Sequence, residues 1–401
     1  MTATSVTRPA PMRILVVTDQ YAPMVGGVPN VTQTLAHGLA GRGHAVTLLV
    51  PNPGTGGQQP AVSGVDAHQV SLACSRSVRW PWYDGMRLAL LSLSAARRLI
   101  SGLAPDVIHI HSPLTLGLVA RLAARQLSIP VIYTNHYLPE NVRPGTTRQS
   151  RLFDMAFYGY LVRFANQCAH VTAPTLTALQ LLRAQGLRAP AQVISNGIDL
   201  RTYCPGPADS VIRERYGLRA DRPLILYVGR LSQEKGVDVL LAAVARLTTD
   251  AQVAIAGRGP DSARLAATAD RLGLSGRVRF LGFVPDDDLP AVYRLADVFA
   301  IPSRAELQSL ATMEAMATGL PVVASDAYSL RELVSHGRTG LLITPGRADE
   351  LAASLDMLLG APAVRARMAQ ESLRAVSAHE QSRTWIQWES LYGQLAAGGP
   401  R

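Results

Sequence analysis

The sequence of 401 residues lacks several features that mark other classes of protein. Its three cysteines, Cys74, Cys168 and Cys204, show no Cys-x-x-Cys spacing, which argues against a disulfide framework or a zinc site and fits a reducing compartment. No window approaches the roughly 18 consecutive apolar residues of a membrane-spanning helix. Residues 1–11 contain no apolar stretch like that of a signal peptide. We therefore expect a cytoplasmic protein.

Lysine is also scarce, because Lys235 is the only lysine among the 39 Lys and Arg residues. The net charge of +10 is uneven: residues 1–200 carry 16 arginines against 7 acids, and residues 201–401 carry 23 basic residues against 22 acids. A basic first half suggests an anionic partner. No nucleic-acid-binding motif is present, so we expect no nucleic acid and favour an anionic membrane surface at the inner face of the plasma membrane. Arginines that only make the surface soluble are the alternative.

The rest of the chain alternates short β-branched runs with amphipathic stretches, which is typical of parallel sheets covered by helices on both faces. We expect an α/β protein with two doubly wound Rossmann-like domains, residues 1–198 and 199–379, with a Pro- and Gly-rich linker at 199–222. The last helix, about 380–401, carries large aromatic residues, and we expect it to pack back on the first domain. Strands are expected at 13–18, 44–50, 107–111, 130–134, 170–172, 192–194, 224–228, 253–256, 278–281, 298–301, 322–324 and 340–343, and helices in the first domain at 30–42, 88–103, 114–125, 151–165 and 175–185.

A glycine-bearing loop follows the first strand of each domain. Gly26 and Gly27 precede a helix, where close backbone approach and free N–H groups suit a phosphate or a reacting sugar; a plain turn is the alternative. In the second domain, Arg230 and Lys235 of the segment GRLSQEKG (229–236) suit a diphosphate held from two sides. The alternative there is a solvated turn in which the lysine pairs with the glutamate before it.

A Glu-x7-Glu pair follows a later strand. Glu314, two turns into the expected helix, suits a ribose diol, and Glu306 suits sugar hydroxyls. The backbone amides of Gln308, Ser309 and Leu310 at the helix N-terminus suit phosphate oxygens. The alternative is a first-turn carboxylate and a surface carboxylate without a ligand.

Three histidines end two neighbouring strands, but no Asp, Glu or Cys completes a metal shell. We expect His136 to donate a hydrogen bond to a sugar hydroxyl, and His109 and His111 to pack or orient the loop. The acidic triplet at 286–288 also invites a metal interpretation, but it precedes a helix, and N-capping explains it. We therefore predict no metal.

Aromatic residues and arginines are combined in the segment RWPWY (79–83) and in the helix-like stretch 86–100. Such a surface suits a membrane interface. It equally suits a core and an acceptor pocket, and the sequence leaves both open.

Six motifs in order resemble the group 1, family 4 glycosyltransferases of the GT-B fold, over nearly the whole chain. They are GGV at 26–28, GHAV at 43–46, NGID at 196–199, GRL and EKG within 229–236, GRGP at 257–260, and the Glu-x7-Glu segment that runs on into EAMATGLPVVAS at 314–325.

The resemblance implies two domains that face each other across a cleft. It also implies retaining transfer of a hexosyl group from a UDP- or GDP-sugar to an acceptor hydroxyl, without metal or other cofactor. By that resemblance, Arg230 and Lys235 hold the diphosphate, Glu314 takes the ribose, Glu306 takes the donor sugar, and residues 282–284 take the base. The implied catalytic residues are His136, Arg230, Lys235 and Glu306, and the implied nucleotide-sugar-binding residues are Gly26, Gly27, Gly229, Gly257, Gly282, Val284, Gln308, Ser309, Leu310 and Glu314.

One position departs from the family pattern, because Ser309 stands where the family usually has glycine, and this leaves the donor sugar open. The segment TNHYLPE (134–140) resembles a bacterial subgroup whose acceptors are often lipids, so we favour a membrane lipid or glycolipid as acceptor. A soluble acceptor, a nucleotide-sugar epimerase of the same fold and a non-catalytic nucleotide-binding regulator are the alternatives.

Overall fold

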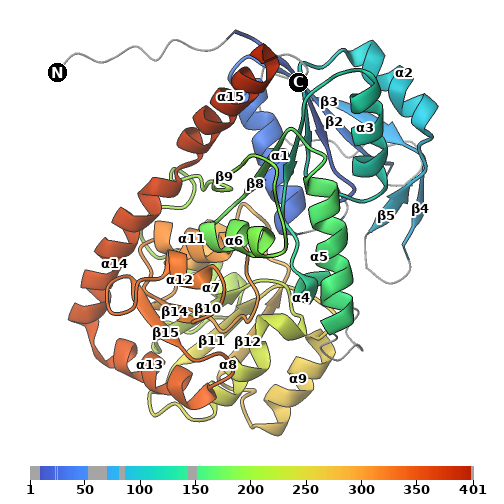
Figure 1. Ribbon diagram of the computed structural model, residues 1–401. Coiled ribbons are helices and arrows are strands. Elements are labelled where there is room, and N and C mark those ends of the chain that lie inside the picture. The colour runs from blue at the N-terminus through green and yellow to red at the C-terminus, as the bar shows by residue number, and fades with distance from the viewer. Residues whose placement is uncertain are drawn as a thin grey trace, which may run out of the picture. The chain divides into compact units, whose positions relative to one another are not determined.

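The computed structural model describes residues 10–22, 24, 26–52, 70–80, 86–142 and 151–398. The chain divides into two compact units (Figure 1). Unit 1 contains Met1–Pro139, Thr146–Ser195 and Ser382–Arg401, and unit 2 contains Glu140–Gly145 and Asn196–Gln381. Residues 81–83 of the aromatic segment lie outside the described residues.

Unit 1 is built on a seven-stranded sheet in the order β3-β2-β1-β6-β7-β8-β9, and all neighbouring strands are parallel. Two further strands, β4 and β5, form a separate antiparallel pair. The strands are β1 (Arg13–Val17), β2 (Ala45–Pro51), β3 (Ser71–Ser75), β4 (Ser77–Arg79), β5 (Arg87–Ala89), β6 (Val107–Ile110), β7 (Val131–Thr134), β8 (His170–Ala173) and β9 (Ala191–Val193).

The central strand of unit 1 sends its side chains alternately into two cores, one on each face of the sheet. Leu15 and Val17 belong to the core that α2 and α3 cover, whereas Ile14 and Val16 belong to the core that α1 and α15 cover. Burial on both faces explains the continuous run of apolar residues in this strand. The helices are α1 (Gly27–Gly41), α2 (Leu93–Leu103), α3 (Thr115–Gln126), α5 (Arg151–Ala165), α6 (Leu176–Ala184) and α15 (Gln381–Ala397).

The C-terminal helix α15 is joined to unit 1 by buried polar contacts as well as by packing. Trp388 and Tyr392 lie in the same core as α1. Glu389, with a side chain only 4% exposed, accepts two hydrogen bonds from Arg42, Nε–Oε1 at 2.6 Å and Nη2–Oε2 at 2.7 Å. Its Oε1 also lies 3.1 Å from Nε2 of His44, whose Nδ1 accepts a hydrogen bond from the backbone N–H of Met12. His44 therefore carries its proton on Nε2 and donates to the carboxylate.

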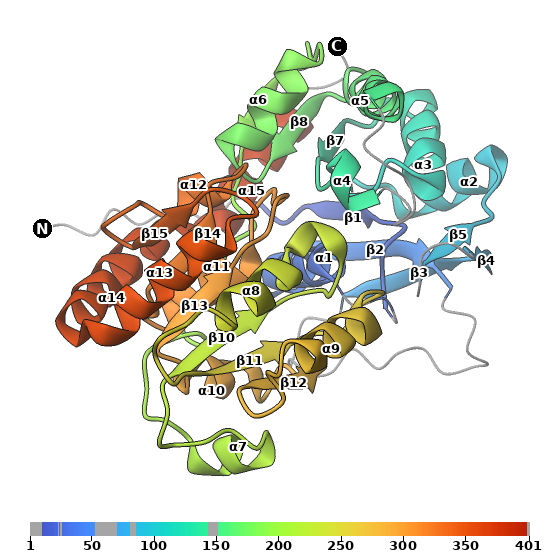
Figure 2. The same cartoon turned by 90° about the horizontal axis from the view of Figure 1, so that it is seen from below.

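Unit 2 contains a six-stranded parallel sheet in the order β12-β11-β10-β13-β14-β15. All six strands are labelled in Figure 2. A single large core surrounds it. The strands are β10 (Leu224–Val228), β11 (Gln252–Ala256), β12 (Val278–Gly282), β13 (Val298–Ile301), β14 (Val322–Ser325) and β15 (Gly340–Ile343). The helices are α4 (Pro139–Val142), α7 (Ser210–Arg215), the 3-10 turn η1 (Gln233–Lys235), α8 (Val237–Val244), α9 (Ser262–Arg271), α10 (Leu289–Arg294), α11 (Leu310–Ala317), α12 (Leu330–Leu333), α13 (Ala348–Gly360), α14 (Pro362–Val376) and the 3-10 turn η2 (Ser377–His379).

Three local expectations from the sequence were wrong. The helix expected at 88–103 begins only at Leu93, because Arg87–Ala89 pairs with β4 and the Ser92 hydroxyl caps the helix by accepting from the N–H of Ala95. The segment expected as a linker at 199–222 contains the helix α7. The helix expected from residue 30 starts three residues earlier, at Gly27.

The interpretation of the acidic triplet as an N-cap also needs correction. Asp288 occupies the position before α10, but its side chain makes no capping hydrogen bond. Both of its carboxylate oxygens lie 2.8 Å from Nη1 of Arg215, and Oδ2 also accepts from the hydroxyl of Tyr216. Asp288 therefore holds α7 against α10. Within the described residues, no helix has the length and apolar character needed to cross a membrane.

Candidate active site

The strand order of unit 2 reverses between β10 and β13, since the chain continues outward from β10 to β11 and β12 on one side and from β13 to β14 and β15 on the other. Ligands of open parallel sheets bind beyond the carboxyl ends of the strands at such a reversal. The loop after β10 carries Arg230 and Lys235, and the loop after β13 carries Glu306. The topology therefore brings the two predicted loops to one edge of the sheet.

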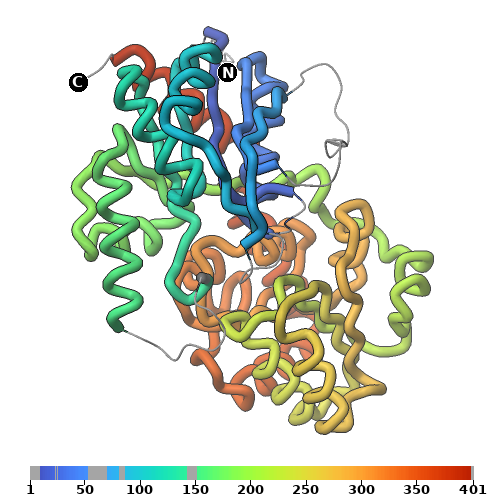
Figure 3. The backbone as a smooth tube through the Cα atoms, turned by 90° about the vertical axis from the view of Figure 1, so that its right-hand side faces the viewer, coloured from blue at the N-terminus to red at the C-terminus, as the bar shows by residue number. Residues whose placement is uncertain are grey.

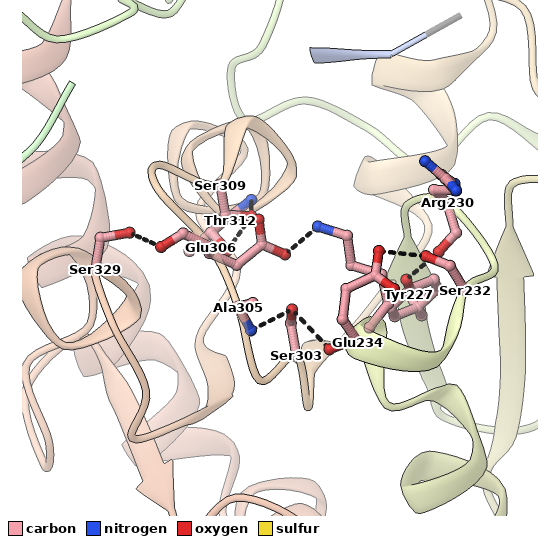
Figure 4. Close-up of polar contacts among 11 residues, drawn as sticks. Tyr227, Arg230, Ser232, Glu234, Ser303, Ala305, Glu306, Ser309, Thr312 and Ser329 are labelled. Atoms are coloured by element: carbon pink, nitrogen blue, oxygen red, sulfur yellow. Dashed lines mark hydrogen bonds and ion pairs between the residues drawn. The ribbon is translucent and has the colours of Figure 1, made fainter. Parts of the chain in front are cut away.

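An ion pair joins these two loops. Nζ of Lys235 lies 2.7 Å from Oε1 of Glu306, and the two side chains are only 17% and 10% exposed. Figure 4 marks this contact with the dashed line that leaves the Glu306 carboxylate. The solvated turn considered above is not formed, because Glu234 accepts from the Ser232 hydroxyl at 2.5 Å. The only lysine of the sequence is thus paired with a residue 71 positions away.

Backbone contacts hold both loops in shape. The backbone oxygen of Glu234 accepts from the N–H of Arg304 at 2.8 Å, and the backbone oxygen of Glu306 accepts from the Ser329 hydroxyl at 2.6 Å. The Tyr227 hydroxyl donates to the backbone oxygen of Arg230. In Figure 4 the Arg230 guanidinium lies apart from the Glu306 carboxylate, so the structure pairs Glu306 with the lysine and not with the arginine.

Two predicted glycines are required by the backbone of this site. Gly229 has a φ of 157° and Gly257 a φ of 142°, conformations that residues with a side chain rarely adopt. A Cβ on Gly257 would lie 1.9 Å from the backbone oxygen of Gly229. The N–H of Gly257 donates to the backbone oxygen of Gly282 at 2.7 Å, which links two predicted positions. Val284, two residues further along the chain, is buried. These glycines allow the loops after β10 and β11 to approach closely.

Gly257→Ala is therefore expected to displace the loop that carries Arg230 and Lys235. We expect a loss of stability of about 2–4 kcal/mol, because the new Cβ collides with backbone and φ is unsuitable. Thermal unfolding of Gly257→Ala should be compared with that of Gly276→Ala, since a Cβ at Gly276 meets nothing within 4 Å. Equal melting temperatures for the two variants would contradict this account.

The helix of the Glu-x7-Glu segment begins later than expected. Leu310 is the first residue of α11, and Ser309 is its N-cap, accepting hydrogen bonds from the N–H and the hydroxyl of Thr312. Gln308 therefore precedes the helix, and its Oε1 accepts from the N–H of Asn196 at 2.8 Å. Glu314 lies one turn into the helix rather than two.

Glu314 is a partly buried carboxyl group with an altered pKa. Its Oε2 accepts from the Tyr293 hydroxyl at 2.7 Å. Desolvation raises the pKa of Glu314 from 4.5 to about 7, although hydrogen bonds from Tyr293 and Tyr203 lower it. Titration near neutrality is typical of functional carboxyl groups. The two tyrosines that contact Glu314 were not predicted, because no pattern in the sequence pointed to them.

This pKa predicts a pH effect on stability. The folded state keeps the Glu314 proton up to about pH 7, whereas the unfolded chain loses it near 4.5. Stability should therefore fall by roughly 3 kcal/mol as the pH rises through this window. Glu314→Gln should remove this part of the pH dependence, measured as the urea midpoint between pH 4.5 and 8. An unchanged profile in the variant would show that Glu314 is not the titrating group.

The remaining predicted residues, Gly26, Gly27 and His136, lie in unit 1. Gly26 is the N-cap of α1, and a Cβ on Gly27 would meet nothing within 4 Å, so no packing among the described residues demands glycine there. Nε2 of His136 lies 2.9 Å from Nδ1 of the buried His111. Both histidines follow strands of the unit 1 sheet, after β6 and β7.

Asp19 is a residue that sequence reasoning missed. It follows β1, is 2% exposed, and its Oδ1 accepts from the Thr115 hydroxyl and the N–H of Leu116 at the start of α3. Burial raises its pKa from 3.8 to about 6. A carboxylate directly after the first strand of a unit was the available signal, because β1 and β6 flank the reversal of strand order in this sheet.

The chain is similar to known proteins in both units. Residues 209–374 match the family model for glycosyl transferases group 1, and residues 25–202 match the model for Glycosyltransferase Family 4. The chain is 30% identical over 396 residues to a GDP-mannose-dependent alpha-mannosyltransferase of Mycolicibacterium smegmatis, which covers 96% of this chain and 97% of that protein. It is 28% identical over 375 residues to the alpha-monoglucosyldiacylglycerol synthase of Streptococcus pneumoniae, covering 92% and 83% of the two chains.

A solved structure, Anabaena HepE in complex with UDP-glucose, superposes with a TM-score of 0.77 at 24% identity, over 95% of this chain and 98% of the other. Two parallel-sheet α/β units with these matches define a glycosyltransferase enzyme of the GT-B fold. The chain belongs to glycosyltransferase family 4, group 1.

Proposed function

We propose that this enzyme transfers a hexosyl group from a UDP- or GDP-sugar to an acceptor hydroxyl, with retention of the anomeric configuration and without a metal. The pairing of Lys235 with Glu306 at the strand-order reversal of unit 2 carries the proposal. The pair supplies a cation for the leaving diphosphate next to a carboxylate for the sugar. The names of the mannosyltransferase relative and of the UDP-glucose complex support this class of donor.

Each side chain of the site has a task in this proposal. Lys235 stabilises the charge that develops on the diphosphate as the glycosidic bond breaks, and Arg230 of the same loop assists. Glu306 exchanges its ammonium partner for sugar hydroxyls and so orients the sugar. Glu314 accepts hydrogen bonds from the ribose diol, and the N–H groups of Ser309 and Leu310 at the start of α11 take phosphate oxygens.

We further propose a membrane lipid or glycolipid as the acceptor, which the diacylglycerol named in one relative supports. The helix α5 offers a surface for such an acceptor. Leu152 is 74% exposed and Met155 is 63% exposed, and with Tyr160 they lie at the spacing of one helical face. Figures 1 and 3 show the amino-terminal turns of α5 (green) extending beyond the sheet of unit 1.

The charge around this face suits an anionic bilayer. Between residues 143 and 163 the sequence has four arginines and one acid, Asp154. An exposed apolar helix face flanked by cations is typical of helices that lie in the headgroup region of a membrane. The occupant proposed for the α5 face is therefore an anionic lipid bilayer.

A vesicle experiment tests donor, acceptor and surface together. Purified protein is incubated with UDP-, GDP- and ADP-sugars, and the released nucleoside diphosphate is measured with and without phosphatidylglycerol vesicles. We expect vesicles to stimulate release, and we expect Leu152→Ser with Met155→Ser to weaken vesicle binding about tenfold, by the loss of buried apolar area. Val211→Ser, at a 63% exposed valine of unit 2, is the matched control.

Other outcomes of this experiment separate the alternatives. Release with soluble acceptors only would keep the transferase and reject the lipid acceptor. Conversion of the donor sugar without any acceptor would indicate an epimerase. No release from any donor by a folded protein would reject the proposed function.

A further inference from the structure

Three histidines of unit 1 form a group at the carboxyl ends of β6 and β7, and of these His136 is only half-buried. His109 and His111 are at most 1% exposed, and their ring centroids lie 4.0 Å apart. The rings of His111 and His136 are nearly parallel, with planes 11° apart and centroids 5.1 Å apart. The backbone N–H of His111 donates to the oxygen of Val17 at 2.9 Å, which fixes this position against β1.

The hydrogen bonds of His109 are complete. Its Nδ1 lies 2.7 Å from the Tyr392 hydroxyl, and its Nε2 lies 2.6 Å from the Thr134 hydroxyl. Hydroxyl groups both donate and accept, so this ring is satisfied in either tautomer. His109 therefore does not determine the tautomers of the two neighbouring histidines. These depend on the contact between His111 and His136.

A hydrogen bond joins Nδ1 of His111 and Nε2 of His136, which lie 2.9 Å apart. Burial lowers the pKa of His111 well below its usual value and that of His136 to about 4, so both rings are neutral near pH 7. Two arrangements remain. Either His111 donates from Nδ1 and His136 carries its own proton on Nδ1, or His136 donates from Nε2 and His111 carries its proton on Nε2.

The other nitrogen of His111 decides between them. Its Nε2 is buried and has no hydrogen-bond partner among the described residues. In the second arrangement this atom would be a buried N–H without an acceptor, whereas in the first it is only an unused lone pair. Orphaned buried N–H groups are the rarer and more costly of the two.

We propose that His111 is a positioning residue that fixes the tautomer of His136, so that His136 presents an N–H donor at Nδ1. With Nε2 occupied by the bond from His111, neutral His136 has no free lone pair. It can donate a hydrogen bond to an oxygen of the substrate, but it cannot take a proton from one. The use of this donor in sugar transfer rests on the proposed function, whereas the tautomer itself does not.

Nitrogen NMR of protein labelled with ¹⁵N-histidine tests the tautomer directly. The chain has nine histidines, and loss of one set of signals in His136→Gln identifies the ring of interest. We expect Nδ1 of His136 to be protonated and Nε2 to be bare in the wild-type protein. A protonated Nε2 on His136 would overturn the proposal.

Two nearly isosteric variants test the role of His111. Asparagine at this position can offer an N–H where Nδ1 of His111 lies, whereas aspartate offers only an acceptor and forces the proton of His136 onto Nε2. We expect His111→Asp to reverse the tautomer and lower kcat about ten- to a hundredfold with little change in KM, because the donor is lost from its place. His111→Asn should keep both the tautomer and most of kcat.

A purely structural role would give a different pattern. Asp and Asn variants that are equally active, or an Asp variant with the wild-type tautomer, would overturn the positioning role. If His111→Asp does not fold, His111→Leu removes the same hydrogen bond without a buried charge. The tautomer of His136 and kcat are then measured in this variant. If the wild-type protein transfers no sugar, the proposed function fails, and the NMR result still decides the tautomer.

Discussion

Lys235→Ala is expected to lower kcat/KM for the nucleotide sugar by at least about 10²–10³-fold, the usual effect of removing one group that stabilises developing charge in the transition state. The substitution removes the ammonium that the structure places 2.7 Å from Glu306 at the strand-order reversal of unit 2. No other lysine exists in the sequence to take its place. Steady-state kinetics with the donor identified in the vesicle experiment measure this loss.

A loss of activity through misfolding must be separated from this effect. Lys235→Ala leaves the Glu306 carboxylate, which is 10% exposed, without its partner, and we expect a stability cost of about 1–3 kcal/mol. The double variant Lys235→Ala/Glu306→Gln should regain this stability but not the activity. Arg347→Ala, which breaks an ion pair with Asp349 in which both side chains are 56% exposed, is the control and should change neither property. Wild-type kinetics in Lys235→Ala would remove the central assignment of the proposed function.

The sequence was sufficient to predict the fold of each unit, because buried parallel strands leave continuous runs of Val, Ile and Leu that recur at regular intervals. The expectation failed at 88–92, because Leu88 and Ala89 belong to β5, which pairs with β4. Such a short antiparallel pair depends on contacts with another segment of the chain, and the leucines and alanine of this segment suit a helix equally well. The cap at Ser92 was visible in the sequence only once the start of the helix was known.

The site was predicted as a set of residues, but the sequence did not show which of them touch. Lys235 and Glu306 were proposed for different parts of the donor, and the structure shows them as an ion pair. The alternative partner for the lysine was its neighbour in sequence, and 3-10 geometry at η1 instead directs Glu234 to Ser232. Pairing of side chains 71 positions apart depends on the order of strands in the sheet, which alternation of elements alone does not specify.

Asp288, outside the site, is a second residue whose partner could not be predicted from the local sequence. An acidic residue directly before a helix is typical of an N-cap, and Asp288 does occupy the N-cap position of α10. The carboxylate instead accepts from Arg215 and Tyr216, and with these partners its pKa is held below the usual value. A charged partner offered by another helix competes with the backbone N–H groups, and local sequence carries no information about that partner.

Glu389→Ala is expected to destabilise unit 1 by about 3–5 kcal/mol, because it leaves the Arg42 guanidinium and the Nε2–H of His44 without their acceptor. The His44 ring is only 1% exposed, so water cannot replace the lost carboxylate there. For a unit of this size we expect the melting temperature to fall by roughly 6–20 °C. Glu371→Ala is the matched control, since Glu371 pairs with two exposed arginines and its loss should change the stability little.

The acid sensitivity of the protein gives an independent test of the same contact. Burial alone would raise the pKa of Glu389, but the hydrogen bonds from Arg42 and His44 lower it below its usual value. A carboxyl group with a lowered pKa contributes stability above its unfolded pKa of about 4.5 and loses that contribution as the pH falls through the folded value. Glu389→Gln should therefore flatten the stability profile below about pH 5. Hydrogen exchange should show the amides of α15 opening first in Glu389→Ala, and wild-type protection of these amides would mean that apolar packing of Trp388 and Tyr392 holds the helix without the ion pair.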